Sequence, residues 1–331
     1  MSKRILIVKL SSMGDIFHAL PAVHALKTGL DAEIDWVVQT EYADCARHFT
    51  DVSGVIPFHR HGFFSNLPRF LAELRSKRYD LIVDLQGILK SAVILVMARG
   101  ARRIGPSFHR EGTRLLYPEV AGRRNKNRHA VDENFDVVRH LGLPAGEPCF
   151  PLDIPNIPVS LPGPRIGIAP SSRWPSKNWP IESFIIACQT LQRRAGAHIV
   201  LFGGGPDKAA ARAIAEALGS GVTDFAGRTT IAETMGLLKQ MDLVISNDTG
   251  PMHLAAALKV PVVALFGPTD PVRTGPYGGA SVVIRAKDAP CSPCFKARCR
   301  RPDRACMEGI APDAVVQAAL QLLQRPPSPA L

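Results

Sequence analysis

The chain has 331 residues, of which 46% are hydrophobic and 21% are charged. This length accommodates two domains of ordinary size, and the composition excludes a disordered chain. No segment approaches the roughly 20 apolar residues that cross a bilayer. The apolar run Ile5–Val8 is too short for the core of a signal peptide, and Lys9 ends it. We therefore expect a cytoplasmic protein.

Basic residues are concentrated in one part of the chain. The formal charge is +11, and nine Lys or Arg lie between Arg99 and Arg128 against only Glu111 and Glu119. Such a block favours a polyanion, such as a phosphorylated lipid, a nucleic acid or an acidic membrane face. A solvated, flexible basic loop is the alternative. Sparse aromatic residues and the lack of a recognition motif argue against nucleic acid.

The first half of the chain alternates short apolar runs with segments of helical period. Strands are predicted at Arg4–Lys9, Ile34–Val38 and Asp80–Asp84. Helices are predicted at Ile16–Leu26, Leu89–Met97 and His129–Leu141, the last ending at Gly142. The segment Leu143–Pro164 carries seven prolines and no clear period, which indicates a linker.

The same alternation then starts again. Strands are predicted at Ile166–Ala169, His198–Phe202, Leu243–Ser246 and Val262–Phe266, and helices at Ile181–Arg194, Asp207–Leu218, Ile231–Gln240 and Met252–Leu258. Two such halves predict two doubly wound α/β domains, over residues 1–157 and 163–331. Ligands of these folds bind at the carboxyl ends of strands, so the strand-to-helix loops are the candidate sites. In a two-domain protein of this kind we expect the site to lie in the cleft between the domains.

The first candidate loop is KLSSMGD, Lys9–Asp15. Gly14 allows close backbone approach, and Ser11 and Ser12 supply hydroxyls near the unpaired N–H groups of a helix start. Asp15 could accept a proton from a substrate hydroxyl as a general base. A helix N-cap is an equally good interpretation of this aspartate.

Three further loops of the second half follow strands. In SRWPSKNWP (Ser172–Pro180), Lys177 precedes a helix start and suits a diphosphate better than it suits helix stability. In FGGGPD, the glycines allow close approach and Asp207 could bind ribose hydroxyls. In SNDTGPMHL, the turn of Asp248, Thr249 and Gly250 could form an anion nest with His253 facing it. The alternatives without a ligand are that Lys177 is an exposed loop lysine and that His253 is packed and hydrogen-bonded within the domain. No Walker A motif or G-x-S-x-G elbow is present.

These motifs together resemble glycosyltransferase family 9, the ADP-heptose:lipopolysaccharide heptosyltransferases. The likeness rests on KLSSMGD, on DLQG-x-x-KSA at Asp84–Ala92, on K-x-W-P at Lys177–Pro180 and on SNDTGPMHL, and it spans nearly the whole chain. It implies a GT-B fold of two Rossmann-like domains, an N-terminal acceptor domain and a C-terminal nucleotide-sugar domain whose last helix can pack back on the first. The implied reaction is inverting, metal-independent transfer of heptose from an ADP-sugar to a Kdo or heptose hydroxyl.

The resemblance also implies a role for individual residues. Asp15 would be the catalytic base. The donor would be bound by Ser12, Gly14, Ser172, Lys177, Asp207, Asp248, Thr249, Gly250 and His253, and the acceptor by Lys90, Arg60 and Arg110. The acceptor would be a lipid-linked anionic oligosaccharide, with the enzyme in peripheral contact with the inner face of the inner membrane. The SSMGD loop resembles enzymes that add the first heptose, whereas the SNDTGPMHL segment and the late cysteines resemble those that add later sugars.

Four of the seven cysteines crowd one segment, as Cys291, Cys294, Cys299 and Cys306. Four thiolates at short spacing could hold a structural zinc or iron, reduced thiols are nearly as plausible, and a reducing compartment disfavours disulfides. Two alternatives to the heptosyltransferase hypothesis stay open at this point. One is a related transferase with another nucleotide sugar. The other is a non-enzymatic polyanion-binding protein stabilised by a metal.

Overall fold

The computed structural model describes residues 2–324. The chain divides into two compact units, one ending at Asp153 and the other beginning at Ile154, which we call the N-terminal and C-terminal units. Residues 143–164 form no helix or strand apart from an isolated bridge between Phe49 and Leu152. No helix among residues 2–324 is both long and apolar enough to cross a membrane.

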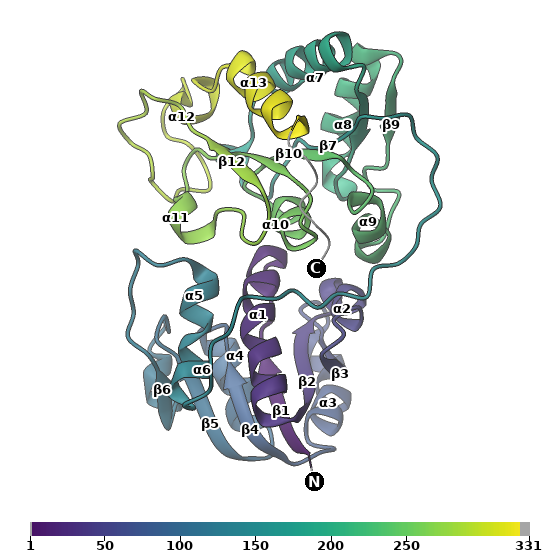
Figure 1. The fold of residues 1–331 in the computed structure, drawn as a ribbon. Helices are drawn as coiled ribbons and strands as arrows, with labels where there is room; N and C mark the ends of the chain where they lie inside the picture. The colour runs from purple at the N-terminus through teal and green to yellow at the C-terminus, as the bar shows by residue number, and fades with distance from the viewer. Residues whose placement is uncertain (1, 325–331) are drawn as a thin grey trace. The chain divides into compact units, whose positions relative to one another are not determined.

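The N-terminal unit is built on a six-stranded parallel sheet in the order β3-β2-β1-β4-β5-β6 (Figure 1). Its strands are β1 (Lys3–Val8), β2 (Ala32–Gln39), β3 (Val52–Phe58), β4 (Tyr79–Asp84), β5 (Gly100–Pro106) and β6 (Glu119–Ala121). The connecting helices are α1 (Met13–Leu30), α2 (Thr40–Arg47), α3 (Phe63–Leu74), α4 (Leu89–Met97), α5 (Ala130–Asn134) and α6 (Asp136–His140), with the 3₁₀ turn η1 (Thr113–Leu116).

The C-terminal unit has a second six-stranded parallel sheet in the order β12-β11-β10-β7-β8-β9. Its strands are β7 (Arg165–Ala169), β8 (His198–Leu201), β9 (Val222–Asp224), β10 (Leu243–Asn247), β11 (Val262–Leu265) and β12 (Ser281–Ile284). Its helices are α7 (Ile181–Ala195), α8 (Lys208–Leu218), α9 (Ile231–Leu238), α10 (Gly250–Ala257), α11 (Pro271–Thr274), α12 (Ala305–Glu308) and α13 (Pro312–Leu323), with the 3₁₀ turns η2 (Pro175–Lys177) and η3 (Gly205–Asp207). Helix α13 packs beside α7 and against β10, β11 and β12.

Both sheets follow one topology. Counted within its own unit, each has the order 3-2-1-4-5-6, with β7 in the place of β1 and β10 in the place of β4. The chain reverses direction across the sheet between strands 1 and 4, and this switch point leaves a crevice at the carboxyl ends of the two strands. The prediction of two doubly wound α/β domains is therefore confirmed, and each unit has its own switch point.

The central strands carry the core, as expected of parallel strands covered on both faces. Ile5–Val8 of β1 and all of β10 are buried. Helix α1 is buried along most of its length, including Pro21. These central elements were predicted, and α4 has the bounds that its period indicated.

Other predictions were wrong in detail. The helix predicted over His129–Leu141 is two short helices that meet at Phe135. There the Asn134 amide donates to the carbonyls of Ala130 and of His18 in α1. The basic segment is not one flexible loop, because it contains β5, η1 and β6, and Arg102 pairs with Glu119 across two of these strands.

Candidate active site

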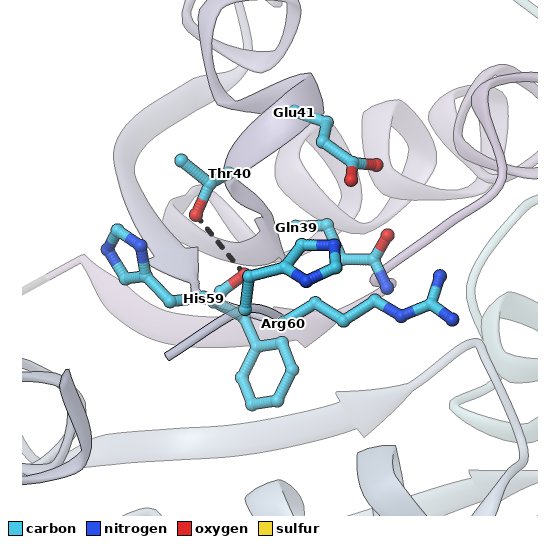
Figure 2. A pocket seen from close by; sticks show the side chains of 7 residues that line it. Gln39, Thr40, Glu41, His59 and Arg60 are labelled. Carbon is cyan, nitrogen blue, oxygen red and sulfur yellow. Dashed lines mark hydrogen bonds between the residues drawn. The ribbon is translucent and has the colours of Figure 1, made fainter. Parts of the chain in front are cut away.

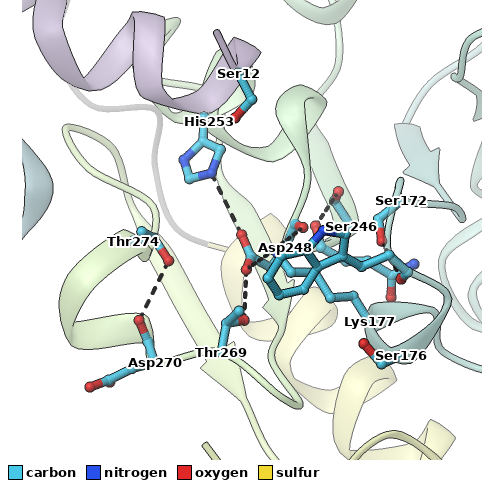
Figure 3. A network of polar contacts seen from close by, with 12 residues as sticks. Ser12, Ser172, Ser176, Lys177, Ser246, Asp248, His253, Thr269, Asp270 and Thr274 are labelled. Atoms are coloured by element: carbon cyan, nitrogen blue, oxygen red, sulfur yellow. Dashed lines mark hydrogen bonds and ion pairs between the residues drawn. The ribbon is translucent and has the colours of Figure 1, made fainter. Parts of the chain in front are cut away.

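The C-terminal switch point brings together the loops that follow β7 and β10. Lys177 Nζ, from η2, donates to Asp248 Oδ2 at 2.7 Å, although the two residues are 71 positions apart. The ammonium also lies over the ring of Trp174, 4.9 Å from its centroid. Thr269, from the loop after β11, donates its hydroxyl to the same carboxylate oxygen at 2.6 Å. Figure 3 shows this network around Asp248.

The Asp248 carboxylate is charged despite its burial. It is 4% exposed, and burial alone would raise its pKa. The hydrogen bond with His253 and the charge of Lys177 outweigh burial and lower the pKa of Asp248 to about 2. His253 Nε2 lies 3.6 Å from the other oxygen, Oδ1. The carboxylate therefore fixes one cation and one imidazole at the same end of the sheet.

Two side-chain amides fix the loops themselves, one of which, Asn247, is fully buried. The Asn247 side chain donates to the carbonyl of Pro170 at 2.7 Å and accepts from the backbone N–H of Trp179 at 3.1 Å. It thus ties the end of β10 to the segment after β7. Asn178 accepts from the N–H of Ser172 at 2.8 Å, so the loop that carries Lys177 closes on itself.

Helix α10 begins beside this network. Thr249 is its N-cap in extended conformation, Gly250 is its first residue, and neither is fully buried. The first N–H groups of a helix lack intrahelical partners and attract anions. Lys177 and this helix start are the two features that suit a diphosphate. Asp207 follows β8 instead, where its Oδ2 accepts from the N–H of Gly204 at 2.7 Å.

The N-terminal switch point is built in the same way. The Gln86 side-chain oxygen, after β4, accepts from the N–H groups of Leu10 and Ser11, after β1, at 3.0 and 3.1 Å. Gly87 has φ +72°, and a Cβ there would lie 3.1 Å from the Cα of His109. This glycine is therefore needed where the loops after β4 and β5 pass closely.

Asp15 is not the N-cap of α1. The cap is Ser12, and Asp15 is the third residue of the helix. Its Oδ2 accepts from the N–H and the hydroxyl of Ser12 at 2.9 and 2.8 Å. Both bonds use one oxygen, so within residues 2–324 the other oxygen, Oδ1, makes no hydrogen bond. Gly14 is buried in the first turn of the same helix.

Buried charges lie beneath the Ser11–Asp15 loop. Lys9 is 4% exposed, and its Nζ donates to the carbonyl of Leu85 at 2.6 Å. Burial lowers the pKa of Lys9, and the negative charges of Asp15 and Asp84 oppose that shift. Asp84 is wholly buried, and burial raises its pKa. Four donors oppose this effect: the Tyr117 hydroxyl at 2.6 Å, the Ser91 hydroxyl at 2.7 Å and the N–H groups of residues 86 and 87.

The basic residues predicted at the acceptor side all follow strand ends of the N-terminal unit. Arg60 follows β3 and lines a hollow of about 300 Å³ at the carboxyl ends of β2 and β3 (Figure 2). The other lining residues are Gln39, Thr40, Glu41, Phe58, His59 and His61. Lys90 Nζ lies 5.6 Å from the centroid of the Phe58 ring. Arg110, after β5, donates its N–H to the carbonyl of Gly87 at 2.8 Å, and its charge contributes to lowering the pKa of Lys9.

The predicted metal site of the four late cysteines is not supported. No group of three or more His, Cys, Asp or Glu among residues 2–324 is placed to hold a metal ion, and all four cysteines are free thiols. Their surroundings differ, because Cys291 is exposed whereas Cys306 is buried against Gly267. Burial and the neighbouring cysteines raise the pKa of the Cys306 thiol.

Sequence reasoning singled out most of these residues but missed several that fix them. Thr269 belongs to a strand-end turn, yet its partner Asp248 is 21 positions away. Gln86 lies in the DLQG motif, and no local pattern indicates that it binds the β1 loop. The hollow lined by His59 and His61 also had no separate signal. In each case the one usable clue was a polar residue in the loop that follows a strand.

Comparison with known proteins agrees with this architecture. The model of glycosyltransferase family 9 (heptosyltransferase) matches residues 68–304. Lipopolysaccharide heptosyltransferase 1 of Pseudomonas aeruginosa is 31% identical, over 89% of this chain and 87% of the relative. Lipooligosaccharide heptosyltransferase 2 of Haemophilus ducreyi is 29% identical, over 80% of this chain and 82% of the relative. The E. coli heptosyltransferase WaaC, solved with ADP, superposes with a TM-score of 0.80 at 26% identity, covering 96% of this chain and 99% of that one.

Two Rossmann-like domains that match WaaC over nearly their full length define a GT-B-type glycosyltransferase. The family model covers well over half of the chain, and the chain belongs to glycosyltransferase family 9, the heptosyltransferase family. It is therefore an enzyme, and the alternative of a non-enzymatic polyanion-binding protein is excluded.

Proposed function

We propose that the protein transfers heptose from ADP-heptose to a hydroxyl of the lipopolysaccharide inner core, with inversion and without a divalent metal. The observation that carries this proposal is the network of Lys177, Asp248 and Thr269 beside the start of α10. It offers a cation and unpaired N–H groups where a metal-dependent enzyme would place its ion. The names of the relatives, and the ADP in the WaaC structure, support the choice of donor.

In this proposal the C-terminal domain, residues 163–331, binds the donor. Lys177 and the N–H groups of Thr249 and Gly250 neutralise the diphosphate, with His253 held beside them by Asp248. Ser172 lies in the loop that carries Lys177, and Asp207 serves the ribose hydroxyls at the end of β8. As the bond between the anomeric carbon and the phosphate oxygen breaks, ADP leaves with the electron pair. These groups stabilise the charge that develops on it.

The N-terminal domain, residues 1–157, binds the acceptor. Asp15 takes the proton from the attacking hydroxyl through Oδ1, while Ser12 holds Oδ2. Gly14 lets the backbone approach the donor sugar. Lys90, Arg60 and Arg110, all at strand ends of this domain, would pair with carboxylates and phosphates of the acceptor. A lipid-linked anionic acceptor places the enzyme at the cytoplasmic face of the inner membrane.

Donor competition with the purified chain tests the proposal. We expect turnover with ADP-heptose and none with UDP-sugars, and the reverse result would overturn the choice of donor. Two acceptors are offered, one ending in Kdo and one already carrying a heptose. The second is included because one relative is a heptosyltransferase 2. Product analysis of the anomeric linkage reports inversion, and EDTA is expected to leave the rate unchanged.

Asp15→Asn tests the base. Loss of a general base lowers kcat by roughly 100-fold to 10,000-fold, whereas the dissociation constant of ADP should stay within about twofold. The matched control is Asp31→Asn at the other end of α1, an exposed position with φ +46° that asparagine tolerates. Equal activity of the two variants would remove Asp15 from the chemistry.

A further inference from the structure

Half of the large apolar side chains exposed in residues 2–324 lie in one short stretch of the N-terminal unit. Leu89, Val93 and Val96 are 50%, 41% and 48% exposed, and Leu115 is 93% exposed. The first three are spaced i, i+4 and i+7 on α4, so they form one stripe along that helix. Leu115 is in η1, which packs against α4. We call these four residues the α4 patch.

Cations stand at both ends of this stripe. Lys90 is in the first turn of α4, over the Phe58 ring. At the other end, Arg103 donates to the carbonyls of Leu95 and Ala98 at 3.3 and 2.9 Å. Arg114, next to Leu115, donates to the carbonyl of Tyr117 at 2.8 Å.

No carboxylate compensates the charge of these three cations, because their partners in the described part of the chain are carbonyl groups or an aromatic ring. Glu111 is the opposing acid, since its Oε2 accepts from the N–H of Leu89 at 2.8 Å. Other members of the basic segment are neutralised, as Arg102 by Glu119 and Arg128 by Asp136. The charge that remains near the α4 patch is therefore positive.

We infer that the α4 patch is the surface with which the protein contacts an anionic lipid membrane. Apolar side chains that enter the boundary between headgroups and acyl chains, ringed by Lys and Arg, match the chemistry of such a surface. A lipid surface requires no complementary shape, so four side chains are enough. The inference deepens the proposed function and rests on it in one respect: the protein needs to contact a membrane because its proposed acceptor is lipid-linked.

A second copy of the chain fits the same surface less well. An isologous dimer through the α4 patch would bring two sets of like charges together. Specific protein interfaces also take roughly 20 to 30 residues a side, far more than this stripe supplies. The first turn of α4 belongs at once to the stripe, through Leu89, and to the predicted acceptor side, through Lys90. Docking of α4 would therefore bring Lys90 to the level of the lipid headgroups.

Cosedimentation with vesicles tests the inference on the full-length protein. The test variant is Val93→Ser with Leu115→Ser. The matched control is Ile186→Ser with Val272→Ser, at positions 50% and 57% exposed on α7 and α11 of the C-terminal unit. We expect the test variant to bind phosphatidylglycerol vesicles at least tenfold more weakly than wild type, and the control to bind like wild type. Phosphatidylcholine vesicles or 0.5 M salt should weaken wild-type binding, because the cations are then no longer attracted.

Equal vesicle binding by both double variants would overturn the inference. So would a wild-type dimer, seen by sedimentation, that only the test variant dissociates, because a second copy would then cover the patch. Equal melting temperatures of the two variants guard against misfolding. Turnover of ADP-heptose on a deacylated, water-soluble acceptor should be the same for all three proteins. Failure of that turnover in wild type would refute the proposed function and leave the vesicle result standing.

Discussion

Replacing Asp248 by asparagine tests the electrostatic account of the C-terminal site. The wild-type carboxylate is 4% exposed and accepts from Lys177 and Thr269. A pKa lowered from 3.8 to about 2 corresponds to roughly 2.5 kcal/mol of stabilisation of the charged form. Loss of a buried, charged hydrogen-bond partner gives a similar figure of about 1.5 to 3 kcal/mol. We therefore expect the Asp248→Asn variant to lose about 2 to 3 kcal/mol of unfolding free energy at pH 7.

The stability difference between wild type and the Asp248→Asn variant should change with pH in a defined direction. The pKa of Asp248 is lower in the folded chain than in the unfolded chain, so its contribution is complete above about pH 5. It is lost as the pH falls from 3.8 toward 2. The difference between wild type and variant should thus be roughly 1 kcal/mol smaller at pH 3 than at pH 7. Denaturant titration followed by the fluorescence of Trp174 and Trp179 in a chain whose third tryptophan, Trp36, is replaced by phenylalanine measures both values.

Asp242→Asn is the matched control for that experiment. Asp242 pairs with Arg165 in the same unit, but its side chain is 38% exposed. An exposed pair of this kind contributes about 0 to 1 kcal/mol. A loss in Asp248→Asn no greater than in the control, or a difference that does not shrink toward pH 3, would show that the Asp248 charge does not stabilise the fold.

Three further predictions concern the N-terminal unit and the cysteines. Tyr117→Phe removes a buried hydrogen bond of 2.6 Å to the β4 carboxylate and should lower the unfolding free energy by about 1 to 3 kcal/mol; an unchanged urea midpoint would contradict this. Gly87→Ala should be destabilised by about 1 to 3 kcal/mol more than Gly112→Ala, since both glycines have φ near +70° but only the first has backbone within 3.1 Å of a Cβ; equal melting temperatures would refute the close approach. In timed alkylation read by mass spectrometry, the exposed Cys291 should react well before the two thiols whose pKa burial raises to about 12, Cys45 and Cys188, and simultaneous labelling would count against their burial.

The central strands and the longer helices could be predicted from sequence because local pattern and tertiary burial agree there. In β1 and β10 continuous apolar runs coincide with burial on both faces. The outer strands β3, β5 and β6 were missed, since they are only partly buried. In addition, β3 contains Pro57, β5 contains Arg102 and Arg103, and β6 is only three residues long. The break at Phe135 depends on a hydrogen bond from Asn134 to α1, which no local period encodes.

The loops of the site could be located because a parallel sheet collects its strand ends on one edge. That rule placed Lys177 and Asp248 correctly within their loops without predicting that they touch. Their contact follows from the strand order, which puts β7 beside β10. The metal hypothesis for the four cysteines is unsupported in residues 2–324 for a related reason, since spacing along the chain does not specify how four side chains are oriented.

Each of the two switch points contains one charged residue that is suited to the proposed chemistry. In each, a charged group is held by its neighbours through part of its bonding capacity and keeps the rest for a ligand. Asp15 uses Oδ2 for Ser12 and retains Oδ1. Lys177 has three N–H groups; it makes one short bond to Asp248 Oδ2 and one bond of 3.4 Å to the Asp248 carbonyl. A group that is already fixed loses little entropy on binding and does not need to reorient as charge develops. For Asp15 this means that its bonds from the N-cap residue Ser12 and its proposed role as base are compatible, because Ser12 fixes one carboxylate oxygen and leaves the other for the substrate.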